Sequence, residues 1–248
     1  MPSTASHRRP SGKPRLKGKV ALITGASRGI GFAVAQLLAA EGCDLIVTGR
    51  SESGLKRISK EFGRSRVLAY PCDVRDPHSV DALFRAVRGE FRRLDILINN
   101  AGIAHPNLPV DKLPYPIWKD VLATNLDGTF LVTQAALAIV KRGATIVNNL
   151  SIAATRVFAG CAGYNASKHA ALGLTNTLRE ELRPRGIRVI GVLPGATDTD
   201  IWKTLWPQAP RRKMMSAETV ARIVVDAILL PPNATVETLE LLPSAGTL

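Results

Sequence analysis

The sequence predicts a single α/β domain of the doubly wound type, in which helices cover both faces of a parallel seven-stranded sheet. Short runs rich in Val, Ile and Leu alternate with longer helical patterns, without internal repeats, as right-handed βαβ units require. The length of 248 residues and the hydrophobic content of 46% suit one domain with a sizeable core.

Seven strands are expected in order along the chain. They lie at residues 20–24, 45–48, 67–71, 96–99, 145–150, 188–193 and 239–242, with helical patterns between them. In parallel sheets of this kind, ligands bind beyond the carboxyl ends of the strands. The residues that follow these strands are therefore the first candidates for a functional site.

The first strand leads directly into a glycine-rich turn, Thr-Gly-Ala-Ser-Arg-Gly-Ile-Gly at residues 24–31, and then into an apolar helical pattern. Glycines let backbone N–H groups approach a dinucleotide pyrophosphate, and a helix N-terminus favours its negative charge. The spacing is not the commoner G-x-G-x-x-G, and the alternative is a glycine-rich helix start without a ligand. The predicted cofactor contacts here are Gly25, Ser27, Arg28, Gly29, Ile30 and Gly31.

Tyr164 and Lys168 stand four residues apart and therefore share one face of a helix. A free phenol has a pKa of about 10, and a nearby ammonium group would bring this pKa toward the catalytic range. Ser151, which follows a strand, would hydrogen-bond the same substrate oxygen. The tyrosine–lysine spacing is common by chance, so its meaning depends on the motifs around it.

Together with Asp73-Val74, Asn99-Asn100-Ala101-Gly102, Asn125 and the segment 194–199, these motifs resemble the short-chain dehydrogenase/reductase family in their order and spacing. The resemblance spans residues 16–243, nearly the whole chain. It implies a Rossmann-type fold and an oxidoreductase that interconverts a carbonyl compound and its secondary alcohol by hydride transfer.

In this family's pattern the catalytic residues are Asn125, Ser151, Tyr164 and Lys168. Tyr164 would act as general acid and base, and Lys168 would keep its pKa low and also reach the cofactor. Asn125 would hold a water that relays protons through Lys168, although a lone helical asparagine is more often structural.

The resemblance also implies cofactor contacts after the later strands. Asp73 and Val74 would contact the adenine, although Asp73 would equally suit a turn before Pro77. The remaining implied contacts are Asn99, Ala101 and Gly102 near the adenosine ribose, and Pro194, Gly195, Thr197 and Thr199 at the nicotinamide end. Asn99 would equally stabilise the centre of the sheet, and Thr199 would equally cap the segment that starts at Ile201.

The end of the second strand indicates which nicotinamide cofactor is used. An NAD-specific protein usually places an acidic residue there, but this chain has Gly49, Arg50 and Ser51. The guanidinium of Arg50 suits a 2′-phosphate, Arg28 would point at the same phosphate, and Ser51 would add a hydrogen bond. Asp44 lies at the wrong end of the strand, roughly 16 Å away at ~3.3 Å per residue. We therefore predict NADP(H), the alternative being two ordinary surface arginines.

Substrate contacts are expected from the stretches that follow Gly102, Ser151 and Thr199. The candidates are Ala153, Val157, Cys161, Ile201 and Trp202. A short lid is predicted over residues 199–215, in which Trp202 and Trp206 would close over an apolar substrate or merely pin the lid to the body. His105 would more simply occupy a surface turn before Pro106 than contact the substrate.

The favoured substrate is a ketone, an aldehyde or a 3-oxo acid. Residues 238–243 lack the double glycine found at this place in many 3-oxoacyl-acyl-carrier-protein reductases, and residues 230–236 resemble reductases of small hydroxy acids and general carbonyl compounds. Reduction of an acyl-carrier-protein or acyl-CoA thioester is the second alternative, because a net charge of +13 would attract an acidic carrier protein. A non-catalytic NADP(H)-binding protein is the third.

Residues 1–15 are predicted to form a flexible basic tail, and residues 16–248 the catalytic domain. The tail carries Arg8, Arg9, Lys13 and Arg15 without an acidic residue, so a solvated segment is favoured over a nucleic-acid arm. The resemblance implies a homotetramer, or a dimer, formed through the helices around residues 124–140 and 164–183.

Composition excludes several other classes of protein. Three cysteines without metal-like spacing favour a reducing, cytoplasmic setting. The sequence shows no membrane-spanning run and no signal peptide. No metal is expected, because the four histidines are too dispersed to form a site; they are His7, His78, His105 and His169.

Overall fold

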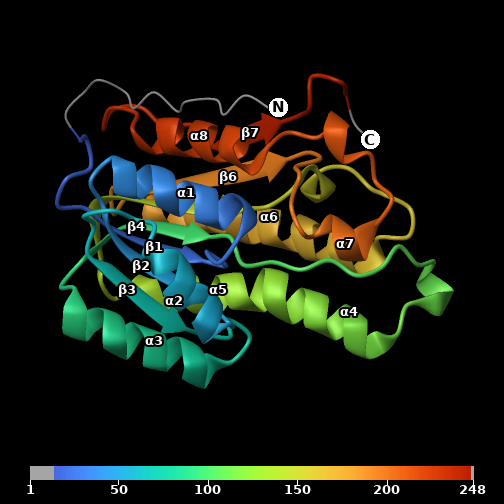
Figure 1. The fold of residues 1–248 in the computed structure, drawn as a ribbon, viewed down its shortest axis with the longest axis horizontal. Helices are drawn as coiled ribbons and strands as arrows, with labels where there is room; N and C mark the ends of the chain where they lie inside the picture. Colours follow the sequence, from blue (N-terminus) through green and yellow to red (C-terminus); the bar gives the residue numbers. More distant parts are fainter. Residues whose placement is uncertain (1–13, 247–248) are drawn as a thin grey trace.

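The structure, a computed structural model, describes residues 14–246. One sheet of seven parallel strands has the order β3-β2-β1-β4-β5-β6-β7, which confirms the predicted fold (Figure 1). The strands are β1 (Val20–Thr24), β2 (Asp44–Gly49), β3 (Val67–Pro71), β4 (Leu94–Asn99), β5 (Val140–Asn149), β6 (Arg188–Pro194) and β7 (Thr238–Leu241).

Helices connect the strands and cover both faces of the sheet. The α-helices are α1 (Gly29–Ala40), α2 (Glu52–Ser59), α3 (Pro77–Glu90), α4 (Tyr115–Leu122), α5 (Gly128–Ala136), α6 (Ala162–Leu182), α7 (Trp202–Leu205) and α8 (Ala217–Ile228). The short turns η1 (Val110–Lys112), η3 (Ile152–Ala154) and η4 (Arg211–Lys213) are 3₁₀ helices, and η2 (Ala123–Asp127) is a π-helical turn between α4 and α5.

The start of β5 differs from the prediction. The strand begins at Val140 rather than at residue 145, because Val140 pairs with Leu94 before the register shifts between Leu94 and Ile96. Lys141 and Arg142 are exposed and interrupt the apolar run. The hydrophobic pattern therefore indicated only the buried half of this strand.

The core consists of two apolar layers, one on each face of the sheet. In β1, Ala21 and Ile23 pack with α1, α2 and α8, whereas Val20 and Leu22 pack with α3, α5 and α6. Helices α1 and α8 accordingly lie on one face of the sheet and α3 on the other (Figure 1). Because both faces are buried, the strands are apolar throughout.

Side-chain caps help to set where two of the outer helices begin. At the start of α3, Asp76 accepts a hydrogen bond from the backbone N–H of His78 at 3.0 Å, and Pro77 occupies the first turn. At the start of α8, Ser216 accepts from the backbone N–H of Thr219 at 3.1 Å. Each cap satisfies a backbone donor that the helix itself leaves unpaired.

The predicted basic tail falls largely on residues 1–13, which lie outside the described residues. Arg15 belongs to the folded domain, because its backbone N–H and its guanidinium contact the buried carboxylate of Glu41 at 3.2 and 3.5 Å. A buried carboxylate requires such partners. Arg15, the last residue of the predicted tail, therefore contacts the folded domain.

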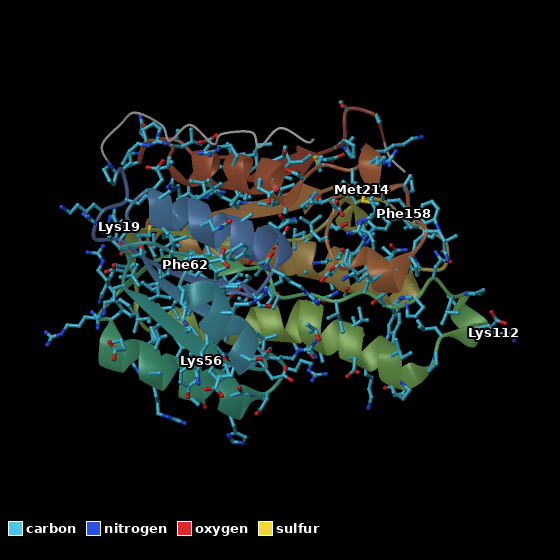
Figure 2. The ribbon with its side chains drawn as sticks, viewed as in Figure 1. Lys19, Lys56, Phe62, Lys112, Phe158 and Met214 are labelled. Atoms are coloured by element: carbon cyan, nitrogen blue, oxygen red, sulfur yellow. The ribbon has the colours of Figure 1, made fainter. Side chains whose placement is uncertain are left out.

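Most charged side chains lie on the surface, and most large apolar side chains lie in the interior. Lys56 and Lys112 extend from the surface, each with 72% of its side chain exposed, whereas Phe62 is buried in the core (Figure 2). None of the helices within residues 14–246 has both the length and the apolar character needed to cross a bilayer.

Candidate active site

A cavity of about 1120 Å³ opens at the carboxyl ends of the strands, where the strand order reverses between β1 and β4. Ligands bind at this switch point in doubly wound sheets. The cavity is lined by the glycine-rich turn, by residues that follow five of the strands and by the predicted lid. Every predicted site residue lines it except Gly31, Ser51, Asn99 and Asn125.

The glycine-rich turn has the geometry that a pyrophosphate site needs. Gly25 and Gly29 have φ angles of +63° and +58°, which side chains disfavour, and α1 begins at Gly29. A Cβ atom on Gly25 would lie 2.9 Å from the Cα atom of Ala101. The turn therefore brings bare backbone and a helix N-terminus to the cavity, and these features fit a dinucleotide phosphate.

Gly31 has a structural role in the glycine-rich turn. It does not line the cavity, and a Cβ atom there would lie 2.3 Å from Nδ2 of Asn100. Asn100 uses this space to donate hydrogen bonds to the carbonyls of Thr24 and Gly25 at 3.0 and 3.1 Å. Gly31 thus shapes the turn by admitting Asn100, and its own contact with a cofactor stays a prediction.

Asn99 also has a role in the sheet rather than in the cavity. It is buried, and its amide donates to Thr133 Oγ1 at 2.8 Å and to Asn148 Oδ1 at 2.9 Å. Successive strand residues point to opposite faces, so Asn99 points away from the cavity that Asn100 lines. The contacts of Asn99 therefore fit the structural one of the two roles considered for it, and Asn100 of the same motif lines the cavity although it was not named as a cofactor contact.

The three catalytic candidates meet at one end of the cavity. Ser151 follows β5, and its Oγ accepts a hydrogen bond from the backbone N–H of Ala153 at 3.1 Å. Lys168 on α6 is 6% exposed, and its Nζ lies 5.7 Å from the centre of the Tyr164 ring. All three side chains line the cavity. The structure therefore brings together residues that come from two separate elements.

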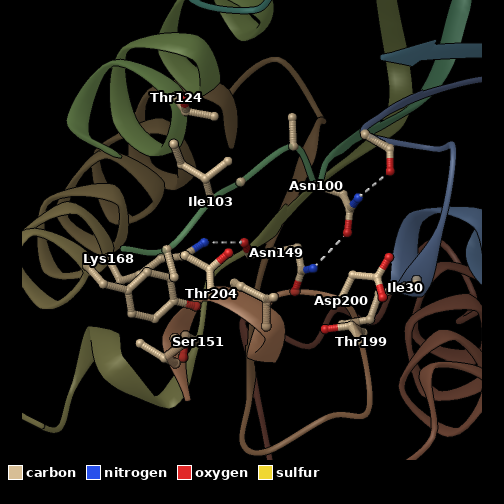
Figure 3. Close-up of a pocket in the computed structure, with 18 of the residues that line it drawn as sticks. Ile30, Asn100, Ile103, Thr124, Asn149, Ser151, Lys168, Thr199, Asp200 and Thr204 are labelled. Atoms are coloured by element: carbon tan, nitrogen blue, oxygen red, sulfur yellow. Dashed lines mark hydrogen bonds between the residues drawn. The ribbon is translucent and has the colours of Figure 1, made fainter. Parts of the chain in front are cut away.

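A chain of hydrogen bonds links Lys168 to the glycine-rich turn (Figure 3). Lys168 Nζ donates to the carbonyl of Asn149 at 3.1 Å, and Asn149 Nδ2 donates to Asn100 Oδ1 at 2.8 Å. The lysine is thereby held toward the centre of the cavity, between Tyr164 and the turn.

Burial changes the pKa values of the catalytic pair. Burial lowers the pKa of Lys168 to about 8. Burial also raises the pKa of Tyr164, against the opposing effect of the Ser151 hydroxyl. The prediction that Lys168 lowers the pKa of the tyrosine is thus wrong for the protein alone, because the loss of hydration outweighs the favourable interactions. Tyr164 therefore keeps its proton at neutral pH.

Asn125 lies behind the cavity wall, in the π-helical turn η2. Its Oδ1 accepts from the backbone N–H of Ile103 at 2.9 Å, and its Nδ2 donates to the Ile103 carbonyl at 2.9 Å and to Ser167 Oγ at 3.0 Å. This side chain braces the loop that follows β4, as the structural alternative for a helical asparagine would have it, and the water relay stays a prediction. π-Helical turns often occur at functional sites.

At the opposite end of the cavity, Asp73 is held by an arginine that the prediction did not include. Arg75 donates to the Asp73 carboxylate through Nε at 3.0 Å and Nη2 at 2.6 Å, and through Nη1 to Asp120 at 3.2 Å. Arg75, and less strongly Arg50, lower the pKa of Asp73. The sequence signal that could have indicated this ion pair is the arginine two residues after Asp73 in the turn.

The residues predicted to recognise the 2′-phosphate differ in their surroundings. Arg50 lines the cavity directly after β2. Arg28 also lines it, but its guanidinium is 71% exposed and pairs with Asp200 at 3.1 Å. Ser51 does not line the cavity, because its hydroxyl caps α2 by accepting from the backbone N–H of Gly54 at 3.1 Å. The hydrogen bond predicted from Ser51 to the phosphate therefore stays a prediction.

The lid is a loop whose two ends are joined by backbone contacts. Met215 donates to the carbonyl of Ala196 at 3.0 Å and accepts from the N–H of Asp198 at 2.8 Å. Within the lid, Trp202 donates through Nε1 to the carbonyl of Thr197 at 2.8 Å, and its ring meets that of Trp206 edge-on at 6.5 Å. Both rings line the cavity, so Trp202 both fixes the lid and forms part of the wall.

The five residues predicted to contact the substrate all line the cavity: Ala153, Val157, Cys161, Ile201 and Trp202. His105 does not line it, and the expectation of a surface turn is wrong, because the ring is 1% exposed. Among the residues that the structure describes, no three His, Cys, Asp or Glu side chains are grouped as a metal site would require.

A doubly wound sheet, a glycine-rich turn at its switch point and a tyrosine–lysine pair in the cavity wall are the features of a dinucleotide-dependent oxidoreductase. The family model described as short chain dehydrogenase matches residues 19–210. The chain belongs to the short-chain dehydrogenase family, whose members interconvert alcohols and carbonyl compounds.

Individual relatives show how widely this family has diversified. The chain is 40% identical to the 3-oxoacyl-[acyl-carrier-protein] reductase FabG of Vibrio cholerae over 192 residues, which cover 77% of this chain and 78% of that protein. It is 38% identical to the D-threitol dehydrogenase of Mycolicibacterium smegmatis over 196 residues, 77% and 75% of the two chains. A short chain dehydrogenase from Burkholderia cenocepacia, solved in complex with NADP, superposes with a TM-score of 0.81 at 34% identity, over 92% of this chain and 97% of that one.

Proposed function

We propose that this protein is an NADP(H)-dependent reductase of ketones or related carbonyl compounds, which also catalyses the reverse oxidation of the alcohol. The observation that carries the proposal is the meeting of Ser151, Tyr164 and Lys168 at the end of a cavity that begins at the glycine-rich turn. The test is NADPH-dependent turnover of a panel of ketones, 3-oxo acids and an acetoacetyl thioester.

In the reductive direction, the hydroxyls of Ser151 and Tyr164 would hold the carbonyl oxygen, and Tyr164 would donate its proton as negative charge develops there. A bound nicotinamide dinucleotide supplies the hydride. The raised pKa of Tyr164 keeps the phenol protonated, which is the form that reduction consumes. The buried charge of Lys168 would stabilise the tyrosinate that remains, because charges act strongly where water is excluded.

The preference for NADP(H) would rest on Arg50, with Arg28 and Arg75 adding positive charge along the same end of the cavity. We expect Arg50→Asp to reduce the ratio of kcat/KM for NADPH to that for NADH by about 100-fold, since the change removes a charge-assisted phosphate contact and adds a repelling carboxylate. Initial-rate kinetics with both cofactors would measure this ratio.

A matched control is Arg57→Asp, which makes the same change of charge on the exposed surface of α2, outside the cavity. It is expected to leave the ratio unchanged. Equal use of NADH and NADPH by the unmodified protein would contradict the role given to Arg50.

A thioester carried by acyl carrier protein is the second candidate substrate. The similarity to the FabG reductase of Vibrio cholerae favours it, as does the net charge of +13, which would attract an acidic carrier. Relative rates with the free ketones and with the acetoacetyl thioester would decide between the two candidates.

Self-association and a cytoplasmic setting complete the proposal. We retain a homotetramer or dimer that pairs α5 and α6, and the exposure of Phe130 on α5, at 46%, supports it. The predicted helix over residues 124–140 ends earlier than expected, since residue 140 belongs to β5. Three free, buried cysteines suit a reducing compartment.

A further inference from the structure

The charged side chains that line the cavity are unevenly distributed. Arg50, Asp73 and Arg75 lie at the end where the dinucleotide would place its adenosine, and Arg28 pairs with Asp200 at the glycine-rich turn. The remaining charged group, Lys168, is hydrogen-bonded to the backbone between Tyr164 and the turn. Among the described residues that line the cavity, these six carry all of its charge.

The opposite end of the cavity, which we call the substrate end, is formed by Asn107 and by those of residues 152–161 and 201–206 that line the cavity. Arg156 and Lys203 fall in these ranges but do not line it, and they pair with Glu240 and Asp200. It presents large apolar side chains, namely Val157, Phe158, Ile201, Trp202, Leu205 and Trp206. Phe158 lies on this side of the molecule, beside the lid (Figure 2). The polar side chains here, such as Asn107 and Thr204, are uncharged.

Two of these apolar side chains are open to solvent although they belong to the cavity wall. Val157 is 79% exposed and Trp206 is 44% exposed. These side chains leave hydrated apolar surface inside the cavity. An apolar ligand that covers this surface is bound more tightly, because removing apolar surface from water lowers the free energy. A carboxylate placed there would lose its hydration without gaining a cationic partner from the described wall, which is strongly unfavourable.

Resting on the proposed function, we propose that the natural substrate is an uncharged carbonyl compound with an apolar aliphatic or aromatic body, and not a free 3-oxo acid. Ser151 and Tyr164 hold its carbonyl oxygen, and its body lies against Val157, Phe158 and the two lid tryptophans.

The decisive comparison uses two substrates that share one ketone. Ethyl acetoacetate and acetoacetate differ in the carboxylate, and acetophenone adds an aromatic body. With NADPH, kcat/KM for the ester is expected to exceed that for the acid by about 100-fold or more, given the cost of desolvating an unpaired carboxylate. Equal or faster use of acetoacetate overturns this inference and leaves the reductase function intact. Turnover of none of the three compounds overturns both.

A pair of variants tests whether the preference for the ester over the acid arises at the substrate end. Val157→Lys places a cation at the substrate end. It is expected to reduce the ratio of kcat/KM for the ester to kcat/KM for the acid by about tenfold, because the cation would pair with the carboxylate. The control Val110→Lys makes the same change on η1, at a side chain that is 75% exposed and does not line the cavity. An equal effect of the two lysines would overturn the assignment of the substrate end.

A second observation concerns the first turn of α6, which carries Tyr164. Cys161 precedes this helix without a side-chain capping bond. Instead, the backbone N–H of Gly163 donates to Nε2 of the buried His105 at 3.1 Å. Because Nε2 accepts, the proton resides on Nδ1, which lies 2.7 Å from the Pro106 carbonyl and donates to it.

Gly163 makes this contact possible. A Cβ atom there would lie 3.2 Å from Cδ2 of His105 and 3.5 Å from Cε3 of Trp118. The ring thus satisfies one of the unpaired donors at the helix start, in the residue immediately before Tyr164. We infer that His105 is a positioning residue, which fixes the direction of the first turn and hence the place of the Tyr164 hydroxyl.

The test compares His105→Phe, which keeps a ring without an acceptor, with His105→Gln, which restores an acceptor. His105→Phe is expected to lower kcat about tenfold or more, because small displacements of catalytic groups are costly, while KM for NADPH stays within about twofold. His105→Gln is expected to recover most of kcat. The control is His169→Phe, which replaces an exposed histidine on α6, the helix that carries Tyr164.

Equal kcat values for the Phe and Gln variants would overturn the positioning role. If His105→Phe does not fold, Gly163→Ala tests the same contact, because its methyl group would press on the ring. A folded Gly163→Ala protein with unchanged kcat would likewise overturn the inference.

Discussion

Replacing Tyr164 with Phe is expected to lower kcat for ketone reduction by about a thousandfold, within the range that general acid catalysis contributes. The phenol is the proton donor, and its pKa is raised, so the proton is in place at neutral pH. The ring and its packing persist in the variant, so NADPH affinity should stay within about twofold. Steady-state kinetics and fluorescence titration with NADPH would measure the two quantities.

Tyr115→Phe is the matched control, because it removes the same hydroxyl from a side chain that is 67% exposed at the start of α4. It should leave both quantities unchanged. A Tyr164→Phe protein that turned over as fast as the unmodified protein would rule out the proposed mechanism. Tight binding of NADPH without turnover in the unmodified protein would instead favour the non-catalytic alternative.

Replacing Lys168 with Met is expected to reduce kcat by two to four orders of magnitude, because the tyrosinate loses its stabilising charge. The same variant is expected to be more stable than the unmodified protein at pH 7, by about 3 kcal/mol at most. This gain follows from the lowered pKa, since the folded protein holds a buried ammonium group that Met replaces with an apolar chain of similar size.

The pH dependence distinguishes this explanation from a change in packing. Burial lowers the pKa of Lys168 from 10.5 to about 8. Between these two pH values the unfolded chain retains the proton that the folded protein has released, so the stability of the unmodified protein rises with pH. The advantage of Lys168→Met should therefore be full below pH 8 and disappear as the pH approaches 10.5.

Denaturant unfolding of both proteins across this pH range would measure the difference. Lys141→Met, at an exposed position of β5, is the control and should show no such trend. A stability difference that is independent of pH would contradict the assignment of a buried charge to Lys168.

Much of the site was predictable because its signals are local. The positive φ angles of Gly25 and Gly29 belong to a turn of a few residues, and the spacing of Tyr164 and Lys168 places them on one helix face in any α-helix. Apolar runs indicated the seven strands. Their alternation with helices predicts a parallel sheet, in which the carboxyl ends of the strands lie at one edge. These features need no knowledge of distant contacts.

Ser51 apart, the differences from the prediction arose where a residue's partner lies far away in the chain. Asn99 and Asn100 could not be assigned to faces, because a strand buried on both sides is apolar throughout and its alternation carries no information. Asn125 contacts Ile103 and Ser167, and His105 contacts Gly163, all across loops that the sequence does not place.

The chain's residues alone were sufficient for the fold class, the conformation of the glycine-rich turn and the placing of Tyr164 and Lys168 on one helix, because backbone conformation and helical spacing depend on near neighbours. Packing decided the protonation of Tyr164 and Lys168, the face that Asn99 occupies and the apolar character of the substrate end. Those properties depend on which groups exclude water from one another, and that is settled only when segments from the whole chain come together.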